Sequence, residues 1–343
     1  MQATRVKELD VLRGLAALMV MWYHFTAYRT QADLGFFYGT TGVELFFMIS
    51  GFVIFMSLNH VETSKQFIVN RFSRLYPTYW ICMSITFLML FFYKHITIDQ
   101  TQVSTFLGNL TMFQFYLKIK DIDDSYWTLI IEMTFYIAIL ALFRFKKLQY
   151  INGIALSLMI IATICGVFFS KNETIKTTLD MFQILQYIPL FLSGIIFYKL
   201  YFQPGKIIQN YGLLLTCLIC QILSFTYSSR FSGSLSLTEY TVSLFIYFGL
   251  FICIIHRKLG FLVNPVTLFL GKISFALYLL HQAISTQILI PYFMEDLHFG
   301  FWTASFLLAM PIIIVMATLI TYFIEAPLRK VIKQGLLPKD QAL

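Results

Sequence analysis

Charged residues are scarce in this chain. They make up 12% of its 343 residues, against about 25% in a soluble globular protein. Hydrophobic residues make up 58%, and phenylalanine alone occurs 37 times. A water-soluble fold could not cover that much apolar surface, so the composition excludes a soluble globular protein.

Cysteine is also sparse, and it forms no disulfide or metal pattern. The five cysteines, Cys82, Cys165, Cys217, Cys220 and Cys253, lie within apolar runs. The C-x-x-C at Cys217 and Cys220 has no nearby histidine or acidic residue. Small apolar residues that pack between helices are favoured over redox chemistry, and we expect no metal.

The sequence also argues against nucleic-acid binding and against a cleaved signal peptide. The net charge is +8, but the basic residues lie between apolar runs, where they set membrane orientation. They form no aromatic-interleaved stripe, so no nucleic-acid partner is expected. The N-terminal segment lacks a cleavage site after an apolar stretch, and we expect the first apolar run to remain in the membrane.

Long apolar runs are what the chain does have, and a run of about 20 residues can cross a bilayer as a helix. We predict an all-α polytopic membrane protein that forms one domain over 1–343. The ten predicted spans are 9–28, 39–58, 75–93, 127–143, 151–169, 184–201, 211–227, 238–256, 266–290 and 302–324. The break between Lys94 and Tyr126 predicts a re-entrant or interfacial segment.

Basic residues predict the orientation. With the N-terminus inside, 18 of the 25 Lys and Arg residues fall on the cytoplasmic side and 7 on the other. Because Lys and Arg are enriched in cytoplasmic loops, both termini are predicted to be cytoplasmic.

Ionisable residues at membrane depth form two predicted layers, and such residues are costly enough to mark function. A rise of about 1.5 Å per residue places four of them in the outer half: His24, Glu44, Glu132 and His281. The second layer, at the cytoplasmic mouth, contains Asp10, Arg13, Arg71, Arg74, Lys272, Glu325 and Arg329. The cationic layer suits a phosphorylated ligand, and the His/Glu layer suits acid–base chemistry.

Arg13 and His24 connect the two layers on one predicted helix. They are 11 residues apart, which is three turns plus about 20° and an axial separation of roughly 16 Å. That separation is comparable to the arm of coenzyme A between its phosphates and its sulfur.

Simpler interpretations stay open for each residue. The pairs Asp10–Arg13 and Glu325–Arg329 fit ion pairs at helix ends. Arg71 and Arg74, just before the third span, could be ordinary cytoplasmic residues that only set orientation. A buried His or Glu can also hydrogen-bond neighbouring helices without any catalytic role.

Six segments, in order, resemble the acyltransferase-3 family of bacterial membrane O-acyltransferases. They are ELDVLRGLAA at 8–17 followed by Tyr23-His24-Phe25, GVELFFMISGF at 42–52, RFSRLYP at 71–77, YWTL at 126–129 continuing to Glu132 and Tyr136, ISFALYLLH at 273–281, and EAPLR at 325–329. The family often has two adjacent acidic residues in the fourth-span motif, whereas here Met133 follows Glu132.

The resemblance implies transfer of an acyl group, usually acetyl, from cytoplasmic acyl-CoA to a hydroxyl of a capsule, O-antigen or exopolysaccharide. It implies acetyl-CoA as co-substrate, a carbohydrate acceptor, surrounding lipid and a bacterial cytoplasmic (inner) membrane. The oligomeric state stays open, a homo-oligomer included.

Roles for single residues follow from the resemblance together with the two layers. Arg13, Arg71, Arg74 and Lys272 are expected to hold the CoA phosphates. His24 is expected to act as general base or as a covalent acyl relay, with Glu132 or Glu44 orienting it. Glu44, Trp127, Tyr278 and His281 are expected on the acceptor side.

A secondary transporter or proton-coupled flippase is the alternative function, because polar layers in a helical bundle also mark transport paths. A non-enzymatic sensor is a further class. The sequence shows no inverted repeat, and its ionisable groups are divided by type into two layers, which favours an enzyme.

Overall fold

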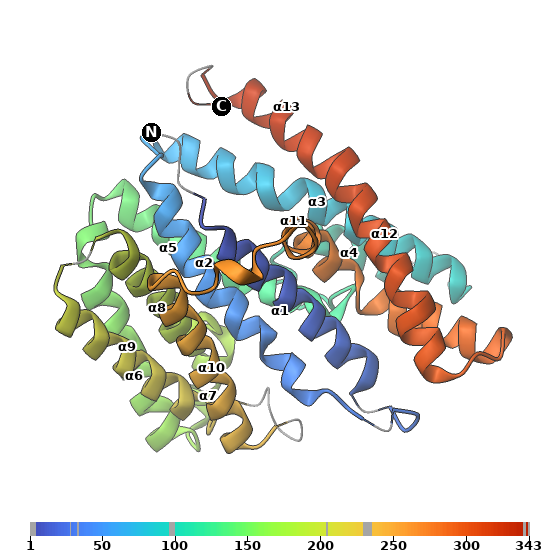
Figure 1. The fold of residues 1–343 in the computed structure, drawn as a ribbon, viewed down its shortest axis with the longest axis horizontal. Helices are drawn as coiled ribbons and strands as arrows, with labels where there is room; N and C mark the ends of the chain where they lie inside the picture. Colours follow the sequence, from blue (N-terminus) through green and yellow to red (C-terminus); the bar gives the residue numbers. More distant parts are fainter. Residues whose placement is uncertain are drawn as a thin grey trace. The chain divides into compact units, whose positions relative to one another are not determined.

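The computed structural model describes residues 5–27, 29–32, 34–95, 100–203, 205–228, 235–338 and 341. No β-strand occurs within these ranges, and the all-α prediction is confirmed. The α-helices are α1 Lys7–Thr26, α2 Gly42–Leu58, α3 Ser64–Tyr93, α4 Gln100–Asn109, α5 Trp127–Arg144, α6 Ile151–Phe169, α7 Glu173–Met181, α8 Ile184–Phe202, α9 Ile207–Ser224, α10 Leu237–Ile255, α11 Pro265–Leu280, α12 Met310–Ile320 and α13 Ala326–Leu336 (Figure 1). Shorter elements include the 3₁₀-helices η1 Phe37–Thr41 and η2 Asp124–Tyr126, and the π-helices η6 Ser285–Leu289, η7 Tyr292–Asp296, η8 Thr303–Ala309 and η9 Thr321–Glu325.

Each of the ten predicted apolar runs is helical, but ten spans are not confirmed. In the described ranges, eight helices are long and apolar enough to cross a membrane, or nine if the bent pair Pro265–Leu280 and Ser285–Asp296 counts as one span. Helix α1 has spanning length, at 20 residues, but Asp10, Arg13 and His24 lower its hydropathy. The chain is a multi-pass helical membrane protein.

The chain packs as two compact units, each assembled from segments that are distant in sequence. The first unit consists of Met1–Ala16, Thr40–Val61 and Thr134–Leu268. The second consists of Ala17–Gly39, Glu62–Met133 and Phe269–Leu343. Helices α1, α5 and α11 therefore contribute residues to both units, and the prediction of a single domain stays a prediction.

The first unit is built around the close packing of α2 on α8. A Cβ added at Gly51 would collide with the carbonyl oxygen of Phe191, and one added at Gly194 would collide with that of Met48. Small residues let two membrane helices approach this closely, and the resulting van der Waals packing holds them together where lipid supplies no hydrophobic driving force. Helices α6, α9 and α10 pack around α8.

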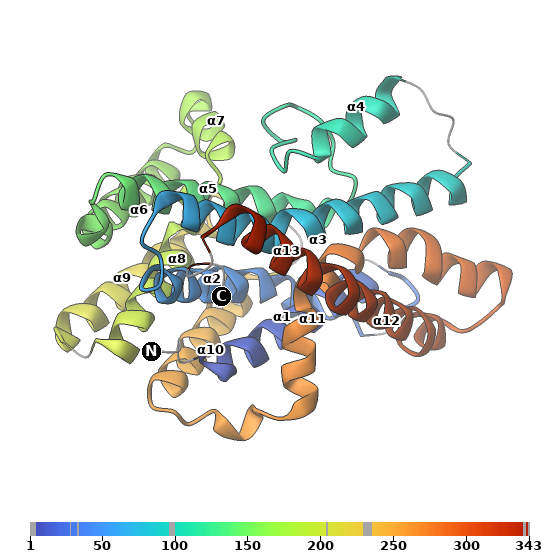
Figure 2. The ribbon, with the colours of Figure 1, turned by 90° about the horizontal axis from the view of Figure 1, so that it is seen from above.

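The second unit is built around α3, which has 30 residues and is the longest uninterrupted α-helix in the described part of the chain. Helix α13 packs against α3 (Figure 1). The segment between α3 and α5 contains α4 and then folds back along α3 (Figure 2). Tyr79 and Trp80 of α3 donate hydrogen bonds to the carbonyls of Asn109 and Leu110. Trp80 precedes the end of α3 by 13 residues, about 20 Å along the axis, so this segment returns along the helix as a re-entrant segment would.

The predicted span 266–290 is broken. Helix α11 ends at Leu280, and the chain bends by 59° before it continues in η6 and η7. No proline or glycine lies at the break, which reads His281-Gln282-Ala283-Ile284. The bend is therefore caused by tertiary contacts, namely hydrogen bonds from the segment 123–128 to the backbone at the break.

Candidate active site

The break after α11 exposes backbone groups that a continuous helix would pair, and the segment 123–128 satisfies them from both sides. Asp123 accepts a 2.7 Å hydrogen bond from the backbone N–H of Ala283. Tyr126 donates a 3.2 Å hydrogen bond to the carbonyl of Leu279. Both side chains are buried, and together they hold the bend that presents His281.

Tyr278 joins the same two segments through its hydroxyl group. This group donates to the carbonyl of Ser125 at 3.0 Å and lies 2.9 Å from the hydroxyl of Thr128. Tyr278, which sequence reasoning placed on the acceptor side, therefore also fixes the start of α5 against the end of α11.

His281 is fully buried at this break. Its Nδ1 lies 2.6 Å from the carbonyl oxygen of Tyr278. Because a carbonyl oxygen only accepts, Nδ1 carries the proton, and in the neutral ring Nε2 keeps its lone pair. No described residue hydrogen-bonds to that buried Nε2. Such a nitrogen can accept a proton or a hydroxyl hydrogen bond from a substrate.

His24 on α1 lies beside His281. The two ring centroids are 5.1 Å apart, with the planes tilted by 51°. His24 is half-buried, so this part of the histidine pair can be reached by a small molecule. The structure brings together two residues from opposite ends of the chain that sequence reasoning placed in one layer.

Glu132 and Trp127 enter the same unit on α5. Glu132 follows Thr128 by four residues, so both lie on one helix face, and Thr128 contacts Tyr278. Glu132 is half-buried, as is Trp127 at the first position of α5. Their catalytic and acceptor roles stay predictions.

A cationic cluster forms where α13 packs against the first half of α3. Arg329 lies within electrostatic range of Arg74, Glu325 and Arg71. Lys333, one turn after Arg329, lies within range of Arg329 and Arg71. The π-helix η9 ends at Glu325, and such turns are frequent at functional sites.

Lys272 lies in the same unit, on α11. Its ammonium nitrogen sits 3.5 Å from the ring centroid of Tyr322 on η9, a cation–π contact. Tyr322 precedes Glu325 by three residues, so Lys272 lies beside the helical run that carries Glu325 and Arg329.

Arg13 and Glu44 belong to the first unit. Arg13 lies 3.5 Å from Asp10, which also pairs with Arg5 at 2.6 Å. This is the helix-end ion pair that the spacing allowed. Glu44 is fully buried in the first turn of α2, where the helix dipole favours a carboxylate. The predicted roles of Arg13 in CoA binding and of Glu44 in orienting His24 or binding the acceptor stay predictions.

Sequence reasoning missed Asp123 and Lys333. Asp123 stands in the run Asp121-Ile122-Asp123-Asp124, which the charge pattern indicates is an exposed loop. Nothing local separates the buried aspartate from its neighbours, because its partner Ala283 is 160 residues away. Lys333 was assigned only to orientation, although its spacing of four from Arg329 places it on the same helix face.

Burial raises the pKa of Asp123 to about 6, and nearby Asp124 adds to the rise. Hydrogen bonds from the backbone N–H groups of Ser125 and Ala283 oppose the shift. Burial also raises the pKa of Asp121, against a hydrogen bond from the Gln114 side chain. The segment therefore carries one carboxyl that changes charge close to neutral pH.

The described residues contain no group of three or more His, Cys, Asp or Glu side chains that could hold a metal ion. The chemistry that they offer is proton transfer at the pair of His24 and His281 and anion binding at a cationic cluster.

These features define a multi-pass helical membrane protein with a histidine site, and the comparisons give its family. Residues 6–326 match the family model Acyl_transf_3, an acyltransferase domain. The chain belongs to the acyltransferase-3 family. It is also 26% identical over 290 residues to a protein of Acidianus two-tailed virus named "Putative acetyltransferase ORF330", covering 82% of this chain and 84% of the viral protein. No solved structure matches the chain.

Proposed function

We propose that the chain moves an acyl group, usually acetyl, from cytoplasmic acyl-CoA to a hydroxyl of a cell-envelope carbohydrate in a bacterial cytoplasmic membrane. The family supports acyl transfer, and the printed name of the viral relative supports acetyl. One observation carries the proposal: the second unit contains both a cationic cluster on α3 and α13 and the pair of His24 and His281.

The cationic cluster binds the donor. Arginine binds phosphate oxygens through two parallel hydrogen bonds, so Arg71 and Arg74 hold the CoA phosphates. Arg329 and Lys333 extend the positive field around them. Arg13 and Lys272 complete the donor site, and the pantetheine arm brings the thioester toward His24.

The histidine pair carries the chemistry. The oxygen of the acceptor hydroxyl attacks the thioester carbonyl, and an imidazole nitrogen takes the hydroxyl proton. The C–S bond then breaks, and the CoA thiolate leaves and takes up a proton. His24 is the base, or it accepts the acyl group as a relay before the sugar does. Glu132 or Glu44 orients it.

The test uses full-length protein purified in detergent, with acetyl-CoA and cell-envelope glycan. The wild type is expected to show a CoA-dependent thermal shift and glycan-dependent release of CoA. Arg74→Gln and Arg13→Gln are each expected to weaken CoA binding about tenfold or more, because a hydrogen bond to a charged group contributes about 1.5–3 kcal/mol. His24→Ala is expected to keep the thermal shift and lose turnover.

The control variant is Lys176→Gln, which removes an exposed cation on α7 and is expected to match the wild type. The reverse pattern, with His24→Ala losing CoA binding and Arg74→Gln losing only turnover, would overturn the assignment. No thermal shift and no turnover in the wild type would reject the enzyme and favour the transporter.

Direct transfer and the relay differ in one intermediate. A labelled acyl-protein that is trapped from the wild type and disappears in His24→Ala supports the relay. Its absence after rapid quenching supports direct transfer.

A further inference from the structure

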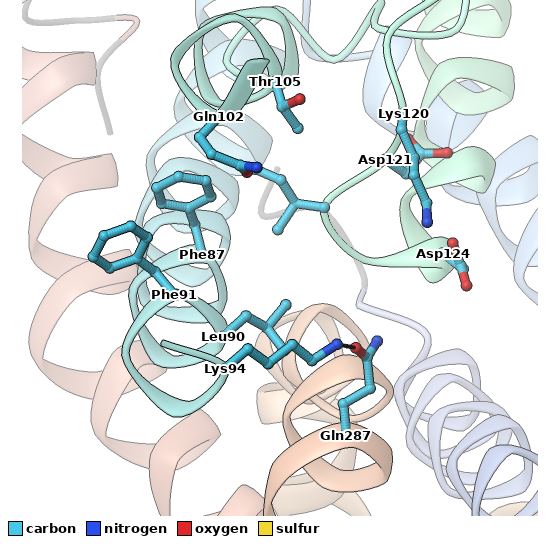
Figure 3. Close-up of a pocket in the computed structure, with 11 residues that line it drawn as sticks. Phe87, Leu90, Phe91, Lys94, Gln102, Thr105, Lys120, Asp121, Asp124 and Gln287 are labelled. Carbon is cyan, nitrogen blue, oxygen red and sulfur yellow. Dashed lines mark hydrogen bonds between the residues drawn. The ribbon is translucent and has the colours of Figure 1, made fainter. Parts of the chain in front are cut away.

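A pocket of about 190 Å³ lies in the second unit, beside the last turns of α3 (Figure 3). It is half-open, and neither the charge pattern nor the motifs of the sequence indicated it. Its walls come from α3, α4, the segment 120–124 and η6: Phe87, Leu90, Phe91, Lys94, Gln102, Thr105, Lys120, Asp121, Ile122, Asp124 and Gln287.

One wall of the pocket is aromatic. Phe87 and Phe91 are one turn apart on α3, and their rings lie side by side in Figure 3, 6.3 Å between centroids and 19° from parallel. Phe106 of α4 packs on Phe87 at 5.0 Å and holds this wall in place. The apolar C–H face of a sugar ring can stack on such a surface.

The facing wall is polar and electrically balanced. Lys120, Asp121 and Asp124 approach from the segment before α5, opposite the phenylalanines in Figure 3. Lys94 donates a hydrogen bond to the Gln287 side chain at the floor of that view. Two ammonium groups and two carboxylates give no net charge, and they offer both the donors and the acceptors that sugar hydroxyls can use.

This lining excludes other ligand classes. A nucleotide or phosphate needs a net positive site, and here Asp121 and Asp124 offset the charges of Lys94 and Lys120. An acyl chain would desolvate four charged groups without pairing them, which is costly. Since a water occupies about 30 Å³, the pocket has room for about six waters. A ligand that replaces them is the size of one sugar ring rather than of an extended oligomer.

The pocket is tied to the histidine pair through the backbone. Asp123, between the lining residues Asp121 and Asp124, accepts the hydrogen bond from Ala283, two residues after His281. Gln287 lies six residues after His281, on η6. A ligand that orders the segment 120–124 therefore acts on the break that presents His281.

We propose that this pocket binds one neutral pyranose unit of the acceptor glycan. The inference rests on the proposed function, because it makes the pocket the acceptor subsite of that reaction. Phe91 stacks on the apolar face of the ring, Asp121 and Asp124 accept hydrogen bonds from its hydroxyls, and Gln287 orients it toward the break after α11.

The test measures binding directly. Saturation-transfer NMR on the full-length protein in detergent uses methyl glycosides of glucose, galactose, rhamnose and N-acetylglucosamine as probes. The wild type is expected to bind at least one of them. Phe91→Ala and Asp121→Asn are each expected to weaken that binding tenfold or more. Asp121→Asn keeps an oxygen that can accept from Gln114, so the loop stays anchored.

Phe92→Ala is the matched control. Phe92 neighbours Phe91 on α3 and touches its ring edge-on, with 5.4 Å between the centroids. It lies outside the pocket and is 69% exposed, so this variant removes aromatic surface beside the pocket and is still expected to bind the glycoside as the wild type does. If no methyl pyranoside binds the wild type, or if Phe91→Ala binds as well as Phe92→Ala, the pocket is not a pyranose site.

Release of CoA from acetyl-CoA, measured on the same preparations, separates the two proposals. Failed glycoside binding with intact CoA release overturns the pocket alone. Specific glycoside binding without CoA release or a CoA-dependent thermal shift supports the pocket as a sugar site and overturns acyl transfer.

Discussion

A neutral imidazole carries one proton, so the partner of one ring nitrogen decides what the other can do. In His281 the Nδ1–H donates a hydrogen bond to the carbonyl of Tyr278, and buried Nε2 has no hydrogen-bond partner among the described residues. With His24 only 5.1 Å away, centroid to centroid, the two rings can act on one hydroxyl proton. Groups that act in one step do not contribute independently to the rate.

The histidine pair predicts a non-additive double mutant. His24→Ala and His281→Ala are each expected to lower kcat/KM about 10²-fold or more, as removal of a general base does. The double variant is expected to lose little more than the worse single variant. His256→Ala, at the exposed end of α10, is the control. Fully multiplicative losses would show that the histidines act in separate steps.

Asp123 predicts a pH dependence of stability. Its folded-state pKa is about 6, above the ordinary value of 3.8, so the folded protein binds this proton more tightly than the unfolded chain. The stabilisation is fully present below pH 4 and is lost as the pH rises through 6, on the order of 3 kcal/mol for a shift of two units. Asp123→Asn, which does not titrate, is expected to lack this component.

The apparent Tm of the wild type and of Asp123→Asn is measured in detergent from pH 4 to 7, and the Tm of the variant is subtracted from that of the wild type. This difference is expected to fall across the interval. Asp180→Asn, an exposed carboxyl on α7, gives the background. A difference curve that is flat across the interval would show that Asp123 keeps one charge state throughout.

At the scale of the element, close approach of α2 and α8 depends on two glycines. Because a Cβ at Gly194 meets backbone rather than a side-chain tip, the helices would have to separate. Gly194→Ala is expected to destabilise the protein by about 1–3 kcal/mol, the usual cost of overpacking. Gly249→Ala in α10 is the control: nothing lies within 4 Å of its added Cβ, and alanine is the better helix former.

Thermal midpoints in one detergent check this prediction, with Gly194→Ala falling and Gly249→Ala holding or rising. Equal midpoints for the two variants would mean that α2 and α8 are not packed backbone to backbone.

The helices themselves could be predicted, because an apolar run of spanning length leaves few alternatives in a membrane. The break after Leu280 could not, since no local residue marks it. It arises from hydrogen bonds of Asp123 and Tyr126 to backbone groups that are 160 and 153 residues away, respectively. The grouping of His24 with His281 followed from depth, whereas the pocket beside Phe91 depends on a folded-back loop that no periodicity encodes.

At the scale of the whole molecule, the cationic cluster constrains the path of the chain through the membrane. Arg71 and Arg74 lie near the start of α3, while Arg329 and Lys333 lie on α13, and the four meet in one cluster. The start of α3 and the end of the chain therefore lie on the same side, and an even number of crossings must separate them. Seven of the unbent spans run from α3 onward, so the bent pair of α11 with η6 and η7 supplies an eighth crossing.

This parity predicts a labelling pattern for single cysteines placed in a background without the five native ones. His60→Cys, before α3, and Gln334→Cys, on α13, are both exposed and are expected to react with a membrane-impermeant maleimide only after permeabilisation. Tyr116 lies in the segment between α3 and α5 and is 41% exposed in the wild-type chain. Tyr116→Cys is therefore expected to react in intact cells. If the bent pair instead turned back without crossing, His60→Cys and Gln334→Cys would react from opposite sides. The cationic cluster could then not form, and a donor site for CoA on α3 and α13 would be ruled out.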